Sequence, residues 1–243
     1  MTLVILAAGF ATRLEPLTID TPKHLLPLKG KKVLMDLFIE TIAEILPGFN
    51  KIILVTNQGY YNKFLSWAKN STVQKIKILS DGVNSKEERI GAIGDLLFAI
   101  DKGKINDDML ICAADYVLRN VDFKKYLKFS EGRSTTIVKE EGIEALKSGS
   151  CLRLGKNFQV TKFAEKPIKP FSNLYGVPYY YLHKSDIRHI GLIPKNLHDN
   201  IGQLVAKLVD DSKIFAYRYS GDIIHLTCEK DYLLLKPLEK TQN

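Results

Sequence analysis

The segment from Leu6 to Leu28, LAAGFATRLEPLTIDTPKHLLPL, gathers residue types that bind phosphate groups. Gly9 follows an apolar run, where a glycine lets the backbone turn with a positive φ and brings N–H groups close to an anionic oxygen. Arg13 and Lys23 can add charge-assisted hydrogen bonds to such oxygens. Loops this long without regular structure are uncommon in compact domains and are usually functional or disordered. The segment therefore predicts a phosphate-binding loop, and the alternative is a stiff surface loop with incidental charges.

Two common phosphate-binding motifs do not fit this segment. The dinucleotide motif GxGxxG fails because Ala11 and Leu14 stand where its second and third glycines belong. The P-loop fails because the later GKK is not followed by Ser or Thr. These departures disfavour a nicotinamide-dependent oxidoreductase.

A carboxylate follows another apolar run, DMLICAAD, which ends at Asp115. A carboxylate at the carboxyl end of a buried strand, facing a basic loop, is a good ligand for a hard cation such as Mg²⁺. The alternative is that Asp115 caps the turn that follows the strand.

The elements that must position these residues alternate through the first half of the chain. Continuous apolar runs predict buried strands, and apolar residues at helical spacing predict helices between them. The expected strands are 2–8, 51–56, 75–79 and 108–115, and the expected helices are 33–46, 60–70 and 91–103. This order predicts an α/β fold with a doubly wound, mostly parallel sheet, in which ligands bind at the carboxyl ends of the strands.

The second half is richer in strands and predicts a mixed-sheet lobe on that core. The expected strands are 134–141, 151–155, 159–167, 176–182, 213–219 and 222–226, with helices over 200–211 and 228–238. No linker rich in Pro, Gly or Ser separates the halves. We therefore expect one domain over residues 1–238, with lobes over 1–120 and 121–238.

The composition narrows the class of ligand and the compartment. The net charge of +8 is spread singly and in pairs, which favours a small phosphorylated substrate over a merely basic surface or a nucleic-acid partner. Cys112, Cys151 and Cys228 form no CxxC pair, so we expect small core residues in a reducing compartment. No apolar run approaches the ~18 residues of a membrane span. The N-terminus is typical of a strand rather than a signal peptide, and the expected location is cytoplasmic.

The opening segment strongly resembles the signature of the nucleoside-triphosphate sugar-1-phosphate nucleotidyltransferases, L-A-A-G-x-G-[TS]-R-[LM]-x-P-L-T-x-x-x-P-K-x-L-x-P. The clear departure is Ala11, where the family usually has glycine. The resemblance implies a Rossmann-like, glycosyltransferase-A-like fold, with nucleotide bound by the first lobe and acceptor phosphate by the second. It implies that the base and ribose lie against Leu6, Ala7, Ala8 and Gly9, and that Gly9, Phe10, Ala11, Thr12 and Arg13 wrap the triphosphate. Arg13 would hold the leaving pyrophosphate, and Lys23 would reach phosphate oxygens near the reacting centre.

Two later stretches resemble the acceptor side of the same family. FAEKP, residues 163–167, matches F-x-E-K-P, in which Lys166 would bind the acceptor phosphate and Glu165 the sugar hydroxyls. NLYGVPYYYL resembles the strand beside the sugar, with Gly176 at the glycine position and Tyr181 as a candidate contact. The tyrosines could equally belong to the core.

The metal site and the base site depart from the family pattern. The resemblance implies Mg²⁺ held by Asp115 and a second ligand, and an ungapped comparison places His225 at that second position. Imidazole suits Mg²⁺ poorly because this ion prefers oxygen ligands. Asp222 is an alternative, as are a softer metal and an impaired site. The usual base-reading glutamine is absent, which leaves Gly91 with Asp81 or Asn84 at the nucleotide and Asp95 facing the acceptor.

The resemblance implies that a sugar 1-phosphate attacks the α-phosphorus of a nucleoside triphosphate, giving an NDP-sugar and pyrophosphate. One alternative is a cytidylyltransferase acting on phosphocholine or inositol phosphate. The other is a catalytically silent regulatory subunit that binds nucleotide sugars. Expected partners are the NTP and a phosphorylated acceptor, without nucleic acid or membrane. The family often forms dimers or tetramers, so a homo-oligomer is left open.

Overall fold

A computed structural model describes residues 1–28, 32–73 and 75–235. Within that part, one nine-stranded mixed sheet runs in the order β10-β6-β9-β4-β1-β2-β3, with β7 paired to β9 and β8 paired to β7. Strands β3, β2, β1 and β4 are parallel, and β9 runs antiparallel to both β4 and β6. The strands are β1 (Thr2–Leu6), β2 (Lys51–Thr56), β3 (Ile76–Ser80), β4 (Met109–Ala113), β6 (Ser134–Glu140), β7 (Ser150–Leu154), β8 (Val160–Glu165), β9 (Leu174–Leu182) and β10 (Ile214–Arg218).

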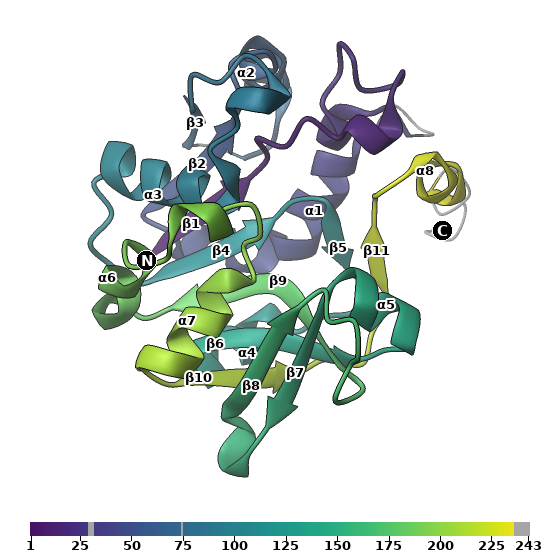
Figure 1. The fold of residues 1–243 in the computed structure, drawn as a ribbon. Coiled ribbons are helices and arrows are strands. Elements are labelled where there is room, and N and C mark those ends of the chain that lie inside the picture. The colour runs from purple at the N-terminus through teal and green to yellow at the C-terminus, as the bar shows by residue number, and fades with distance from the viewer. Residues whose placement is uncertain (29–31, 74, 236–243) are drawn as a thin grey trace.

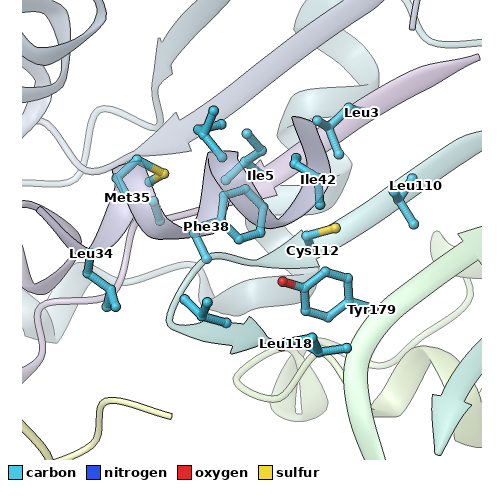
Figure 2. Close-up of a cluster of buried hydrophobic side chains, with 14 of the residues drawn as sticks. Leu3, Ile5, Leu34, Met35, Phe38, Ile42, Leu110, Cys112, Leu118 and Tyr179 are labelled. Carbon is cyan, nitrogen blue, oxygen red and sulfur yellow. The ribbon is translucent and has the colours of Figure 1, made fainter. Parts of the chain in front are cut away.

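Helices cover both faces of this sheet, which explains why the central strands β1, β2 and β4 are apolar and buried over most of their length. Leu3 and Ile5 of β1 pack in one core cluster with α1, α2 and α4, while Val4 and Leu6 pack in a second cluster with α3, α6 and α7. Figure 2 shows side chains of α1 meeting those of β1, β4 and β9 in the first cluster. These helices are α1 (Leu34–Ile42), α2 (Tyr61–Asn70), α3 (Gly91–Gly103), α4 (Phe123–Ser130), α6 (Ile187–Ile190) and α7 (Gln203–Asp211).

A small two-stranded ribbon stands beside the main sheet. It pairs β5 (Tyr116–Leu118) with β11 (Ile223–His225) in antiparallel register, with His225 opposite Tyr116. Two further helices complete the described part, α5 (Ile143–Ser148) and α8 (Glu229–Leu235), and α8 lies beyond the ribbon (Figure 1). The ribbon brings the C-terminal part of the chain to the carboxyl end of β4.

The α/β, mostly parallel architecture with a mixed-sheet half confirms the expected fold class. Its sheet crosses the expected boundary between the lobes at residues 120 and 121. One domain over 1–238 stays a prediction, and residues 236–238, the end of the expected closing helix, lie outside the described residues. Among the described residues, no helix has both the length and the apolar character to cross a membrane.

Some local expectations were wrong. The helix expected over 33–46 ends at Ile42, because residues 43–48, with Pro47, form a 3-10 helix. The sequence pattern did not predict β5, α4, α5 or α6. A signal for α4 was present, since Asp122 caps it by accepting a hydrogen bond from Lys125 N at 2.8 Å. Strand β5 and helix α6 are too short to show a periodic pattern. Cys112 and Cys151 are buried as expected, whereas Cys228 is half-buried.

Candidate active site

A cavity of about 600 Å³ lies at the carboxyl ends of the parallel strands. It is bounded by residues 6–14, the turn before α3, the start of α3, and residues 199–201. Lys23, Asp115 and Lys166 also line it. The position and volume are those of ligand sites in open α/β sheets.

The opening loop is folded by contacts with the turn after β2. Asn57 Nδ2 donates a hydrogen bond to the carbonyl of Ala8 at 2.9 Å, and the hydroxyl of Tyr60 donates to the carbonyl of Thr18. Thr18 Oγ1 donates to the carbonyl of Ala11 at 3.0 Å. Asn57 is fully buried and was missed by the sequence analysis, although a polar residue directly after a buried strand was a usable signal.

The expected positive φ at Gly9 was wrong. The left-handed residue of this loop is Ala11, with φ 52° and ψ 42°. The turn is closed by Leu14 N, which donates to the carbonyl of Ala11 at 2.9 Å. The turn places Arg13 on the cavity wall with its side chain exposed, where the guanidinium is open to an anionic ligand.

Lys23 and Asp115 meet on the floor of the cavity. Lys23 Nζ donates a short hydrogen bond to Asp115 Oδ2, and His225 Nε2 lies 3.5 Å from the same oxygen. Burial alone would raise the pKa of Asp115, but the Lys23 ammonium and His225 together hold that pKa well below its usual value. The carboxylate is therefore charged at neutral pH. The His225 ring stacks on Tyr116 with centroids 3.7 Å apart, which fixes the imidazole.

These donors fit Mg²⁺ only in part. Among the described residues, no three His, Cys, Asp or Glu side chains gather as a metal site. Asp222 does not line the cavity, and its carbonyl accepts hydrogen bonds from Arg119 N and the Tyr219 hydroxyl. Mg²⁺ is commonly held by one or two carboxylates together with water and substrate phosphates. Asp115 fits that arrangement, whereas His225, a nitrogen donor, contacts the carboxylate instead.

Lys166 lines the cavity, whereas the neighbouring Glu165 lies outside the lining. Lys166 has φ 46°, and its Nζ donates to Asn200 Oδ1 at 3.2 Å. Glu165 lies against Gly202, where an added Cβ would come within 2.2 Å of Glu165 Oε2. Burial raises the pKa of Glu165 to about 7, against the opposing effect of the Lys166 charge. The sequence analysis missed Asn200 and Gly202.

Two further acceptor candidates, Tyr181 and Gly176, also lie outside the cavity lining. The Tyr181 hydroxyl donates to Asp108 Oδ2 at 2.7 Å, at the amino end of β4, whereas Asp115 follows the carboxyl end. Gly176 lies under Ser150, whose Oγ an added Cβ would approach to 2.7 Å. Among the described residues that line the cavity, Phe10 is the one Phe, Tyr or Trp. An aromatic cage for phosphocholine is therefore missing from this lining.

The remaining nucleotide candidates lie near the start of α3. Gly91 lines the cavity with φ 78°, and Ile93 N donates to the carbonyl of His198 at 2.9 Å. Asp81 and Asp95 both line the cavity, and the charge of Asp81 raises the pKa of Asp95. Asp95 therefore lies beside Asp81 in this cavity, and its expected position facing the acceptor stays a prediction. Asn84 is outside the lining.

Comparisons with known proteins identify the family and the fold. The family described as nucleotidyl transferase matches residues 2–222. A protein of Sulfolobus acidocaldarius named after mannose-1-phosphate guanyltransferase activity is 28% identical over 234 residues, which cover 95% of this chain and 60% of that protein. The mannose-1-phosphate guanylyltransferase catalytic subunit beta of Danio rerio is 26% identical, over 96% of this chain and 63% of that one. The chain thus spans about three fifths of the length of these relatives.

Solved structures show the same fold. A UDP-glucose pyrophosphorylase in complex with UDP-glucose superposes with a TM-score of 0.80 at 17% identity, covering 100% of this chain and 99% of the other. A UTP-bound UGPase from Acinetobacter baumannii gives a TM-score of 0.76 at 17% identity, covering 100% and 94%. At identities of 17%, the structural similarity establishes a common fold and not a common activity.

Proposed function

Because the chain belongs to the nucleotidyl transferase family, we propose that it joins a nucleoside triphosphate to a sugar 1-phosphate. A phosphate oxygen of the acceptor attacks the α-phosphorus of the nucleotide, an NDP-sugar forms and pyrophosphate leaves. The observation that carries the proposal is the cavity itself, because the opening loop, Asp115 and Lys166 all line it. The names of the relatives favour GTP and mannose 1-phosphate as the first substrate pair to test.

In the proposed reaction, arginine and lysine side chains of the chain bind the phosphate groups of both substrates. Arg13 binds the β- and γ-phosphates that leave as pyrophosphate, and Lys23 binds phosphate oxygens near the reacting centre. Lys166 holds the phosphate of the acceptor, and Glu165 accepts hydrogen bonds from its hydroxyls. Phosphoryl-type transfers of this kind depend on positioning and on neutralisation of charge, without a covalent enzyme intermediate.

Asp115 is the proposed Mg²⁺ ligand, with nucleotide phosphates and water completing the coordination. When bound, the ion would neutralise charge that develops on the phosphate oxygens. Lys23 and His225 hold the Asp115 carboxylate from one side, through contacts with Oδ2. We assign His225 this positioning role instead of a role as a ligand.

The proposal also covers the cellular location and the partners of the chain. We propose a reducing, cytoplasmic location, because the described cysteines are unpaired. The proposed partners are small molecules and not nucleic acid or membrane. The proposal is compatible with a homo-oligomer.

A regulatory subunit without turnover is the second candidate, and His225 at the second metal-ligand position favours it. Pyrophosphate release with Mg²⁺ separates the two candidates. Each of ATP, GTP, CTP, UTP and dTTP is paired with sugar 1-phosphates, phosphocholine and inositol phosphate. Release with one pair, lowered about 10²–10³-fold by Arg13→Ala, supports the transferase. Arg188→Ala, an exposed residue of α6 outside the cavity lining, is the matched control.

If no substrate pair gives pyrophosphate release, the transferase proposal is contradicted. If a nucleotide sugar still raises the unfolding temperature in that case, the regulatory candidate is supported. His225→Asp then tests whether an oxygen donor at this position restores release.

A further inference from the structure

Asp95 is a buried carboxyl group with an oxygen that lacks a hydrogen-bond donor. It lies on α3, is 8% exposed and lines the cavity. Within the described part of the chain, its Oδ1 has no hydrogen-bond partner. Leaving such an acceptor unpaired is costly, so a ligand that brings a donor to this point gains affinity from it.

A second carboxyl group, that of Asp81, lines the cavity beside Asp95 and directly follows β3. Both carboxyl groups line the cavity, and they interact electrostatically. Asp81 Oδ1 is itself fixed by Val83 N, which donates to it at 2.8 Å. Burial, and then the charge of Asp81, raises the pKa of Asp95 to about 8, so the pair retains one proton at neutral pH. The pair thus presents hydrogen-bond acceptors to the cavity with a single negative charge.

The surroundings of the pair suit a flat ring. Leu6 and Ala7 at the end of β1 and Ala92 of α3 line the same cavity with apolar groups. The charged groups of the neighbouring turn, Lys86 and Arg89, also line it. Both are exposed, and Arg89 pairs with Asp199 at 2.8 Å, so they leave the acceptors of the two carboxyl groups available.

We propose that Asp81 and Asp95 select the base of the nucleotide, and that guanine is the base that they accept. This inference rests on the proposed function, because it assigns one end of the same cavity. Guanine has two adjacent donors on its pairing edge, N1–H and the 2-amino group. Uracil and thymine have one N–H between two carbonyl acceptors, and adenine and cytosine have one amino group beside an acceptor nitrogen. Two adjacent acceptors therefore match guanine and oppose a carbonyl of uracil or thymine.

Inosine triphosphate provides the sharpest test, since it differs from GTP only by the missing 2-amino group. Equilibrium binding with Mg²⁺ is measured for GTP, ITP and UTP. We expect the intact chain to bind GTP about 10–100-fold more tightly than ITP, the range for one unpaired buried acceptor. Asp95→Ala should bring this ratio close to one. Asp95→Asn retains an acceptor oxygen and should restore the preference.

Asp101→Ala is the matched control, because Asp101 lies exposed on the same helix and outside the cavity lining. It should leave the ratio of GTP to ITP binding unchanged. If Asp95→Ala does not fold, the nearly isosteric Asp95→Leu also removes this acceptor and carries the same expectation. An unchanged ratio in the folded variant, or tighter binding of UTP than of GTP, overturns the proposal.

Pyrophosphate release, measured in parallel, separates this inference from the proposed function. Selective GTP binding without release in any pairing leaves the base selection intact and contradicts the transferase. Release that requires UTP or dTTP supports the transferase and contradicts the base selection.

Discussion

At the scale of single residues, Ala11 holds the backbone conformation that glycine usually provides. Its φ of 52° lies in the left-handed region, which costs an L-residue ~1–2 kcal/mol. The turn is still formed because Thr18 and Leu14 both hydrogen-bond to the Ala11 carbonyl. Alanine in place of the glycine of the family signature therefore lowers the stability of the turn but does not change its backbone conformation.

Ala11→Gly should raise the free energy of unfolding by ~0.5–1 kcal/mol, since the relief of strain exceeds the added entropy of the unfolded chain. Urea denaturation measures this change. Ala145→Gly is the matched control, because the same exchange inside α5 should lower the free energy by ~0.5–1 kcal/mol. A loss of stability in Ala11→Gly contradicts the argument.

The raised pKa of Asp95 predicts that stability depends on pH. Between about pH 4 and 8 the unfolded chain has lost this proton while the folded chain retains it, so stability falls as pH rises through that window. Asp95→Asn removes the effect. Its unfolding temperature should exceed that of the unchanged chain by at least ~2–4 °C above pH 8, which is the shift given by ~1 kcal/mol at this size.

Thermal unfolding at about pH 4, 7 and 9 measures this difference. The gain in Asp95→Asn should be smallest at the acid end and largest at the alkaline end. Asp101→Asn, on the exposed face of the same helix, should show no such trend. An increase in the unfolding temperature of Asp95→Asn that does not vary with pH would contradict the raised pKa of Asp95.

At the scale of elements, the start of α3 fits closely against the segment before α7. Gly91 has φ 78°, and a Cβ added to it would lie 2.5 Å from the His198 carbonyl oxygen. That carbonyl accepts a hydrogen bond from Ile93 N, so the contact satisfies an otherwise free donor at the helix start. The two segments together form the wall that carries Asp95 on one side and Asn200 on the other.

Gly91→Ala should separate these segments and lower the free energy of unfolding by ~1–3 kcal/mol, through the clash and the strained φ. Nucleotide binding should weaken as well, because Gly91 lines the cavity. Thermal unfolding and equilibrium binding measure the two effects. Gly48→Ala is the control, since its added Cβ meets no atom within 4 Å. An unchanged unfolding temperature in Gly91→Ala contradicts the close fit.

At the scale of the whole molecule, the described part of the chain holds its fold without a closed metal site. Two core clusters, one on each face of the sheet, supply the packing. Asp115 already has Lys23 as its counter-ion, so the carboxylate does not need a cation for the fold to form. The proposed ion therefore belongs to the reaction and not to the architecture.

EDTA should abolish pyrophosphate release, and added Mg²⁺ should restore it. The unfolding temperature of the ligand-free chain should change by less than ~1 °C in EDTA, because the proposed ion binds together with the nucleotide phosphates and does not stabilise the chain without them. A calorimetric scan with and without EDTA checks the second part. A clear fall in that temperature would indicate a structural metal, contrary to the observed donor set.

Much of the site could be predicted from the sequence, because its parts are short and local. The opening loop can be predicted because glycine, arginine, lysine and proline occur in it at fixed spacing. Apolar runs predict the strands whose carboxyl ends position Asp115 and Lys166. The order of strands and helices also follows from local periodicity. These features depend on neighbours in the chain, which a linear sequence displays directly.

Only the tertiary structure decided which of these residues meet. Lys23 reaches Asp115 across 92 residues of chain, and His225 comes to Asp115 through the pairing of β11 with β5. The interaction of Asp81 with Asp95 depends on how α3 packs on the sheet, and Tyr181 is turned to the other end of β4. Contacts of this kind arise from the packing of elements that are distant in sequence, and residue type and local spacing do not encode them.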